Sequence, residues 1–180
     1  MIDQHEPQVL ILAAGANPVM RELSHHSWET FSVNWNTDVK IAFTWLREAL
    51  LKPLSPGSRV VVVSSGAALN GSPLSGGYAG AKATARFIAQ YAQGEADSAR
   101  LGITVTTVMP RMTPFGEVGR QGIRAYAKRS GQTEDEYVQQ LGPLTTPEIA
   151  GSALVDLAAT GPATTEPVYL LTGAGLQPLP

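Results

Sequence analysis

Cysteine is absent from the 180-residue sequence, and histidine occurs only at His5, His25 and His26. The absence of cysteine excludes disulfide bonds, thiol nucleophiles and cysteine-based metal sites. The three histidines do not have the spacing to one another that metal ligands need, and we interpret His25 and His26 as surface-loop residues. The sequence therefore predicts no metal site.

Charge and long apolar runs are also scarce. The formal net charge is −2, 16% of the residues are charged, and the few basic residues are scattered along the chain. This pattern offers no basic patch for nucleic acid or an anionic membrane. No apolar run reaches the roughly 20 residues that cross a bilayer, and the first residues do not form a signal peptide. We expect a cytoplasmic protein with neither a nucleic-acid nor a membrane partner.

Four short apolar runs predict strands at 9–12, 60–63, 103–108 and 168–171. The first two are continuous rather than alternating, which is typical of parallel strands covered on both faces. Helical periodicity fills the segments at 36–51, 77–99 and 146–160. Strands that alternate with helices predict an α/β fold with a parallel, Rossmann-like sheet and flanking helices, in a single domain over 1–180.

Two of these helices carry start signals in the sequence. Asn36-Thr37-Asp38 are cap candidates for the first, and Thr146-Pro147-Glu148 provide a cap, a proline and an acid for the last. A capping box at Thr133 to Glu136 predicts a further short helix.

Small, hydroxylated and glycine residues follow the predicted strands. Ala13 to Asn17, Ser64 to Gly66 and Pro110 to Thr113 each come directly after one of them. Ligands bind at this edge of parallel sheets. Tight turns need the same residue types, so for each loop alone we favour a structural role.

Tyr78 and Lys82 give the strongest chemical signal. They are four residues apart on a predicted helix, and Ser65 lies thirteen residues before Tyr78 at a strand end. Residues four apart share one helix face, so the ammonium can lie near the phenol and favour its ionised form. A tyrosine with a lowered pKa is suited to proton transfer in carbonyl and alcohol chemistry.

The chain resembles the short-chain dehydrogenase/reductase family, Rossmann-type oxidoreductases that use NAD or NADP. The resemblance spans 9–175 and rests on the following stretches: Leu12-Ala13-Ala14-Gly15, Val63-Ser64-Ser65, Tyr78-Ala79-Gly80-Ala81-Lys82, and Val108-Met109-Pro110 followed by Thr113. It implies that Tyr78 is the catalytic acid/base. It also implies that Lys82 binds the nicotinamide ribose and lowers the tyrosine pKa, and that Ser65 positions the substrate carbonyl.

The same resemblance implies a cofactor-binding set and a substrate lid. Ala14 and Gly15 would lie along NADP or NAD, while Pro110, Met112 and Thr113 would approach its carboxamide. The segment 114–142 would cover a small carbonyl or alcohol substrate. Its aromatic residues Phe115, Tyr126 and Tyr137, together with Met112, either line the pocket or pack the helices onto the sheet.

The chain departs from the family at three places. Asp38 falls where the family has a relay asparagine, with Asn34 and Asn36 as competing alignments and helix capping as the structural alternative. Arg111 replaces a glycine and either meets an anion or points to solvent. The third departure is the missing Gly-x-x-x-Gly-x-Gly turn, because the chain begins at about the family's fourth strand and so resembles the family's C-terminal part.

Without the family's first strands, the edge of the strand at 9–12 would be unpaired, and another chain or an oligomer would complete the sheet. Two functions follow. The first is an NAD(P)-dependent oxidoreductase with Ser65, Tyr78, Lys82 and Asp38 as the catalytic set. The alternative is a truncated, non-catalytic relative that acts as a dimerisation or binding partner. Its dimer or tetramer would form through the helices at 36–51 and 77–99.

Overall fold

The computed structural model describes residues 5–161 and 165–179. Five strands form one sheet in the order β1-β2-β3-β4-β5. They are β1 (Val9–Leu12), β2 (Arg59–Val63), β3 (Thr104–Pro110), β4 (Val168–Thr172) and β5 (Gly175–Pro178). The first four are parallel, and β5 runs antiparallel to β4. The predicted α/β fold with a mostly parallel sheet is confirmed.

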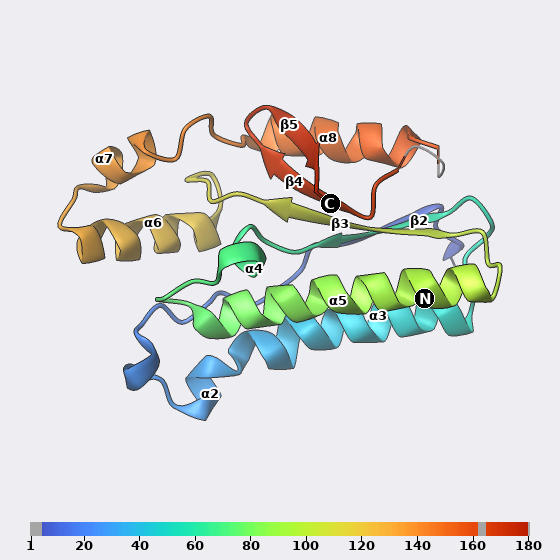
Figure 1. The fold of residues 1–180 in the computed structure, drawn as a ribbon, viewed down its shortest axis with the longest axis horizontal. Coiled ribbons are helices and arrows are strands. Elements are labelled where there is room, and N and C mark those ends of the chain that lie inside the picture. Colours follow the sequence, from blue (N-terminus) through green and yellow to red (C-terminus); the bar gives the residue numbers. More distant parts are fainter. Residues whose placement is uncertain (1–4, 162–164, 180) are drawn as a thin grey trace.

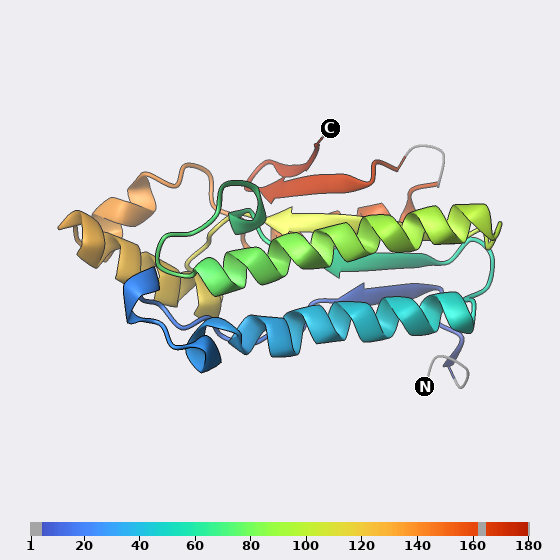
Figure 2. The ribbon, with the colours of Figure 1, turned by 60° about the horizontal axis from the view of Figure 1, so that its bottom comes forward.

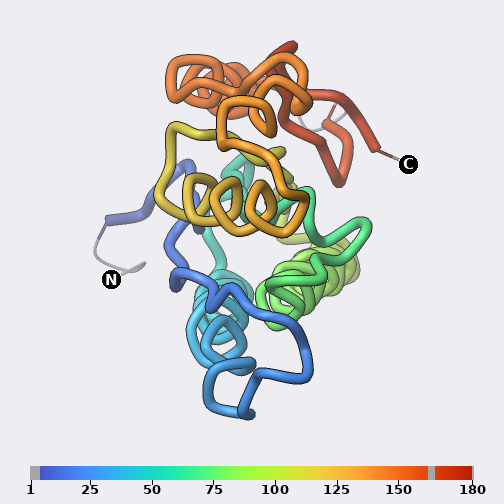
Figure 3. The backbone as a smooth tube through the Cα atoms, turned by 90° about the vertical axis from the view of Figure 1, so that its left-hand side faces the viewer, coloured from blue at the N-terminus to red at the C-terminus, as the bar shows by residue number. Residues whose placement is uncertain are grey.

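Helices cover both faces of this sheet. They are η1 (Leu23–His25), α2 (Trp28–Phe31), η2 (Trp35–Val39), α3 (Lys40–Leu51), α4 (Ala67–Asn70), α5 (Gly76–Ser98), α6 (Glu117–Ser130), α7 (Glu134–Gln139) and α8 (Pro147–Ala159). Figure 1 shows α3 and α5 on one face and α8 on the other, with α6 and α7 beyond one end of the sheet. The end-on view in Figure 3 shows the same three layers.

Each face of the sheet has its own apolar core. Val60 and Val62 pack with Leu46 of α3 and Ala89 of α5, whereas Val61 packs with α8 on the other face. Side chains of a strand alternate between faces, so a strand buried on both sides needs apolar residues throughout. This explains the continuous valine run in β2. Figure 2 shows α3 and α5 lying along the strands that they cover.

The capping signals at the later helices are confirmed. Thr146 accepts a hydrogen bond from the Ile149 backbone N–H and Pro147 occupies the first turn of α8. Thr133 and Glu136 form the predicted capping box of α7. In contrast, β5 was not predicted, because a short strand that begins with glycine and ends with proline has little apolar pattern.

One edge of the sheet is open within the described residues. β1 pairs with β2 on one side, and no strand of residues 5–161 or 165–179 pairs with its other side. Val9 and Ile11 are 36% and 42% exposed there. Among the described helices, none is long and apolar enough to span a bilayer.

Candidate active site

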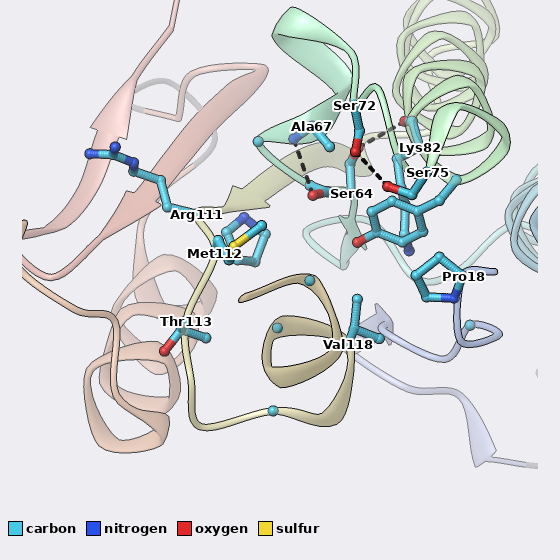
Figure 4. Close-up of a pocket in the computed structure, with 18 of the residues that line it drawn as sticks. Pro18, Ser64, Ala67, Ser72, Ser75, Lys82, Arg111, Met112, Thr113 and Val118 are labelled. Atoms are coloured by element: carbon cyan, nitrogen blue, oxygen red, sulfur yellow. Dashed lines mark hydrogen bonds between the residues drawn. The ribbon is translucent and has the colours of Figure 1, made fainter. Parts of the chain in front are cut away.

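A pocket of about 730 Å³ lies where the first three strands end. Among the predicted site residues, those that line it are Gly15, Asp38, Ser65, Tyr78, Lys82, Pro110, Met112 and Thr113. Ala14 does not line it, although its neighbours Ala13 and Gly15 do. The carboxyl ends of parallel strands meet at one edge, so loops far apart in the sequence converge here. Figure 4 shows part of this lining.

Tyr78 lies in the first turn of α5, largely buried and near Ser65 at the end of β2. Burial raises the pKa of Tyr78, the Ser65 side chain partly lowers it, and the Asp38 carboxylate raises it further. The Lys82 ammonium lies 5.7 Å from the centre of the Tyr78 ring. The pKa of Tyr78 thus shifts in the direction opposite to the lowering that Lys82 alone would cause; burial is the main reason, and a carboxylate partner of Lys82 adds to it.

That partner is Asp38, whose side chain is buried. Lys82 Nζ lies 3.1 Å from Asp38 Oδ2, and the two side chains are 8% and 2% exposed. Lys82 Nζ also donates to the Val63 carbonyl at 3.2 Å. Asp38 Oδ1 accepts from the Ala16 backbone N–H at 2.9 Å. This one carboxylate therefore connects the loop after β1 to α5.

The segment around Asp38 differs from its sequence interpretation. Residues Trp35–Val39 form a π-helical turn that continues into α3, with Asp38 buried inside it and no side-chain cap. The prediction that Asn36-Thr37-Asp38 cap a helix start is therefore wrong. The carboxylate is used in tertiary contacts instead, and single π turns are frequent at functional sites.

The two competing asparagines make different contacts. Asn34 is buried and donates to the Ala16 carbonyl at 2.8 Å and to Asp38 Oδ1 at 3.3 Å. Asn36 is exposed and donates to Ser32 Oγ at 3.2 Å. Of the three candidates, Asp38 is the one whose side chain contacts Lys82.

Glycines on α5 let the 31–35 segment approach this helix closely. A Cβ on Gly77 would lie 2.0 Å from the Phe31 carbonyl oxygen, and one on Gly80 would lie 3.3 Å from the Trp35 ring. A Cβ on Gly15 would lie 2.7 Å from Asp38 Oδ2. These glycines were not singled out in the sequence for packing. Glycines on α5 beside Tyr78 and Lys82 could allow another segment to pack closely against this helix. Only the folded structure shows that this segment is 31–35.

The predicted lid, residues 114–142, contains α6 and α7. The rings of Tyr126 and Tyr137 stack with centroids 6.2 Å apart, and both residues line the pocket. The Tyr126 hydroxyl hydrogen-bonds Ser72 Oγ and accepts from the Leu74 N–H. Phe115 is 49% exposed and does not line the pocket. The segment predicted as a lid is thus tied to the loop that precedes α5.

The polar side chains in the loop after β3 are directed mostly away from Lys82 (Figure 4). The Thr113 hydroxyl donates to the Thr145 carbonyl at 2.7 Å. In Figure 4 the side chain of Arg111 extends away from Lys82 and Ser75. Met112 lines the pocket and also packs near Gly122 of α6.

The profile of the short chain dehydrogenase family matches residues 5–121, more than half of the chain. The chain belongs to this family. The predicted resemblance is therefore confirmed. No curated protein sequence matches the chain significantly.

Solved members of the family share the fold of this dehydrogenase-family chain. Sorbitol-6-phosphate 2-dehydrogenase from Erwinia amylovora superposes with a TM-score of 0.76 at 19% identity, over 92% of this chain and 67% of that one. NAD+-bound xylitol dehydrogenase gives 0.72 at 18% identity, over 92% and 67%. An angucycline C-6 ketoreductase with bound NADP gives 0.51 at 28% identity, over 57% and 38%. The chain therefore spans about two thirds of the length of the first two.

Proposed function

We propose that the protein is an NAD(P)-dependent oxidoreductase that interconverts a ketone and a secondary alcohol. The observation that carries the proposal is the convergence of Ser65, Tyr78 and Lys82 on one pocket at the strand ends. Family membership supports the general reaction class. The combination of a phenol, a hydroxyl and an ammonium in one pocket is suited to proton transfer at a carbonyl oxygen.

The pocket suits the nicotinamide end of the cofactor. Its volume of about 730 Å³ is in the usual range of roughly 300–1,000 Å³ for small-molecule sites. Lys82 has three N–H donors; it donates to the Val63 carbonyl and forms an ion pair with Asp38, which leaves donor capacity for a ribose hydroxyl. The sequence contains no Gly-x-x-x-Gly-x-Gly turn. We therefore assign only the nicotinamide and ribose end to these residues and choose neither NAD nor NADP.

In this mechanism the bound nicotinamide supplies or accepts the hydride. Tyr78 donates its phenolic proton to the carbonyl oxygen in reduction and takes a proton from the alcohol in oxidation. Ser65 Oγ donates a hydrogen bond to the same oxygen. Because burial raises the pKa of Tyr78, the phenol stays protonated near neutral pH, which suits the reduction direction.

The substrate side is formed by the lid. Met112, Val118, Tyr126 and Tyr137 line the pocket, and these side chains are mostly apolar or aromatic. We propose a small carbonyl or alcohol compound held between α6 and the catalytic helix. Closure by 114–142 would exclude water from the reacting atoms.

The experiment begins with a titration of the purified chain with NADH and NADPH, followed by nicotinamide fluorescence. A ketone screen on the cofactor that binds comes next. Tyr78→Phe is expected to retain cofactor binding and to lose about 10²–10⁴-fold in kcat. Tyr91→Phe is the matched control on the same helix because Tyr91 is 64% exposed, and it should keep wild-type turnover. Absence of saturable binding at millimolar cofactor would contradict the proposal.

A second candidate function is assembly with another copy. α3 and α5 leave Phe43, Phe87 and Tyr91 exposed by 54%, 51% and 64%, and large apolar side chains exposed together on neighbouring helices are typical of an interface. This supports a homodimer through these helices, with or without catalysis. Sedimentation of wild type and Phe87→Glu tests it: a dimer that dissociates in the variant is expected, and a monomeric wild type would contradict it.

A further inference from the structure

Asp38 is an acid fixed on three sides within the candidate active site. Its Oδ1 accepts from the Ala16 N–H at 2.9 Å and from Asn34 Nδ2 at 3.3 Å, and its Oδ2 lies 3.1 Å from Lys82 Nζ. With 2% of its side chain exposed, the carboxylate is held in one position relative to the ammonium. A buried carboxylate and ammonium at this distance act electrostatically as a pair.

The pocket holds few other charges that could act on Tyr78. In the described part of the chain, the charged residues that line it are Asp38, Lys82 and Arg111, and the other titratable ones are Tyr126 and Tyr137 of α6 and α7. Arg111 follows β3, is exposed, and extends away from Lys82 in Figure 4. The charges that act most directly on Tyr78 are therefore one positive and one negative.

We propose that Asp38 is a positioning residue that holds the Lys82 ammonium against the end of β2 and cancels its charge beside the Tyr78 hydroxyl. The inference rests on the proposed function, since it defines Tyr78 as a neutral proton donor poised for carbonyl reduction. Without Asp38, an uncompensated ammonium 5.7 Å from the Tyr78 ring centre would favour phenolate. Asp38 thus keeps Tyr78 in its neutral form, which donates a proton during carbonyl reduction.

The electrostatics agree with this geometry. Burial raises the pKa of Tyr78 and the Asp38 carboxylate raises it further. The ammonium, although on the same helix face, is engaged by Asp38 and by the Val63 carbonyl. One hydrogen bond and one ion pair thus fix the position of the ammonium, and its remaining N–H donors can bind a ligand.

The test is an NMR titration of the cofactor-free protein labelled with ¹³Cζ-tyrosine, with the Tyr78 signal assigned from Tyr78→Phe. Asp38→Asn keeps the side-chain size and the acceptor for Ala16 but removes the charge. It is expected to lower the pKa of Tyr78 by about one unit or more, and to shift the pH profile of ketone reduction in the same direction. An unchanged or raised value in the folded variant would overturn the proposal.

Glu48→Gln is the matched control, because it removes the same charge from α3 at a solvent-accessible ion pair with Arg47. It should leave the Tyr78 signal at its wild-type position. If Asp38→Asn does not fold, the double variant Asp38→Asn/Lys82→Gln replaces a neutral pair by a neutral pair. The pKa of Tyr78 in this variant should stay near its wild-type value. A rise of a full unit would show that Asp38 does not cancel the charge of the Lys82 ammonium in the wild-type protein.

The titration needs no cofactor, so it separates two failures. A folded protein that neither binds nicotinamide nor reduces ketones would end the proposed function, while a lowered Tyr78 pKa in Asp38→Asn would still support the role of Asp38. An active enzyme with an unchanged Tyr78 pKa in that variant would retain the function and reject the role of Asp38.

Discussion

The two halves of α5 use small residues for different purposes. In the first half, Gly77 and Gly80 admit the backbone and indole of the 31–35 segment, next to the buried Lys82. In the second half, Ala85, Ala89, Ala92 and Ala96 are buried against the sheet and α3, and Gly94 has open space around it. Alanine therefore suffices to pack a helix onto a sheet, whereas the pocket end needs a contact at Gly77 that is too close for any Cβ and a tight one at Gly80.

The difference shows how the site is held in place. Alanines spaced three or four apart form one face of a helix, and they position α5 over the strands without fixing any polar group. The glycine contacts and the Asp38–Lys82 pair join α5 to η2 and to the loop after β1. The second half provides the scaffold, and the first half provides the geometry of the pocket.

The largest effect on stability is expected for Gly77→Ala. The added Cβ would lie 2.0 Å from the Phe31 carbonyl oxygen, a backbone atom that no rotamer change can move. Alanine favours a helix over glycine by about 1 kcal/mol, but overpacking costs about 2–3 kcal/mol and outweighs this gain. We expect a lower urea midpoint. A midpoint equal to or above that of wild type would show that the two segments separate readily.

A smaller effect concerns alkaline stability. Because the pKa of Tyr78 is raised in the folded protein, the unfolded chain releases this proton first as the pH passes about 10, the ordinary tyrosine value. The unfolded state then binds fewer protons, so the free energy of unfolding falls as the pH rises. Tyr78→Phe should lose less stability than wild type across this range in chemical denaturation. Parallel curves would contradict the burial of the phenol.

The smallest effect is expected for Gly94→Ala, which is also the control for Gly77→Ala. No atom lies within 4 Å of its added Cβ, so only the helix propensity changes. The variant should gain about 0.5–1 kcal/mol in the free energy of unfolding without altering the Tyr78 titration. A loss of stability would mean that the second half of α5 is as tightly constrained as the first.

Local signals in the sequence predicted much of the fold. The continuous apolar run at Val9–Leu12 matches β1, and the Thr146-Pro147 signal marks the start of α8. These elements depend on neighbouring residues, so a pattern of a few positions is enough. β5 could not be predicted in this way, because its residues lack an apolar pattern and it forms through hairpin pairing with β4.

The candidate site could be predicted only in part. Ser65, Tyr78 and Lys82 are close in sequence, and their spacing on a strand end and a helix places them in one pocket. The partner of Lys82 is 44 positions away in the sequence, and Asp38 has equally good local reasons to cap a helix. Capping and ion pairing use the same carboxylate, so sequence alone could not choose between them.

The sequence by itself determined the order of the four parallel strands and of the long helices that cover them, the family of the chain, and the residues that can carry proton chemistry. All of these follow from local periodicity and short motifs. Tertiary structure alone decided that Asp38 pairs with Lys82, that Gly77 meets the Phe31 carbonyl, and that the pKa of Tyr78 is raised. The reason is physical: burial and charge pairing depend on distances between segments that only the packed chain brings together.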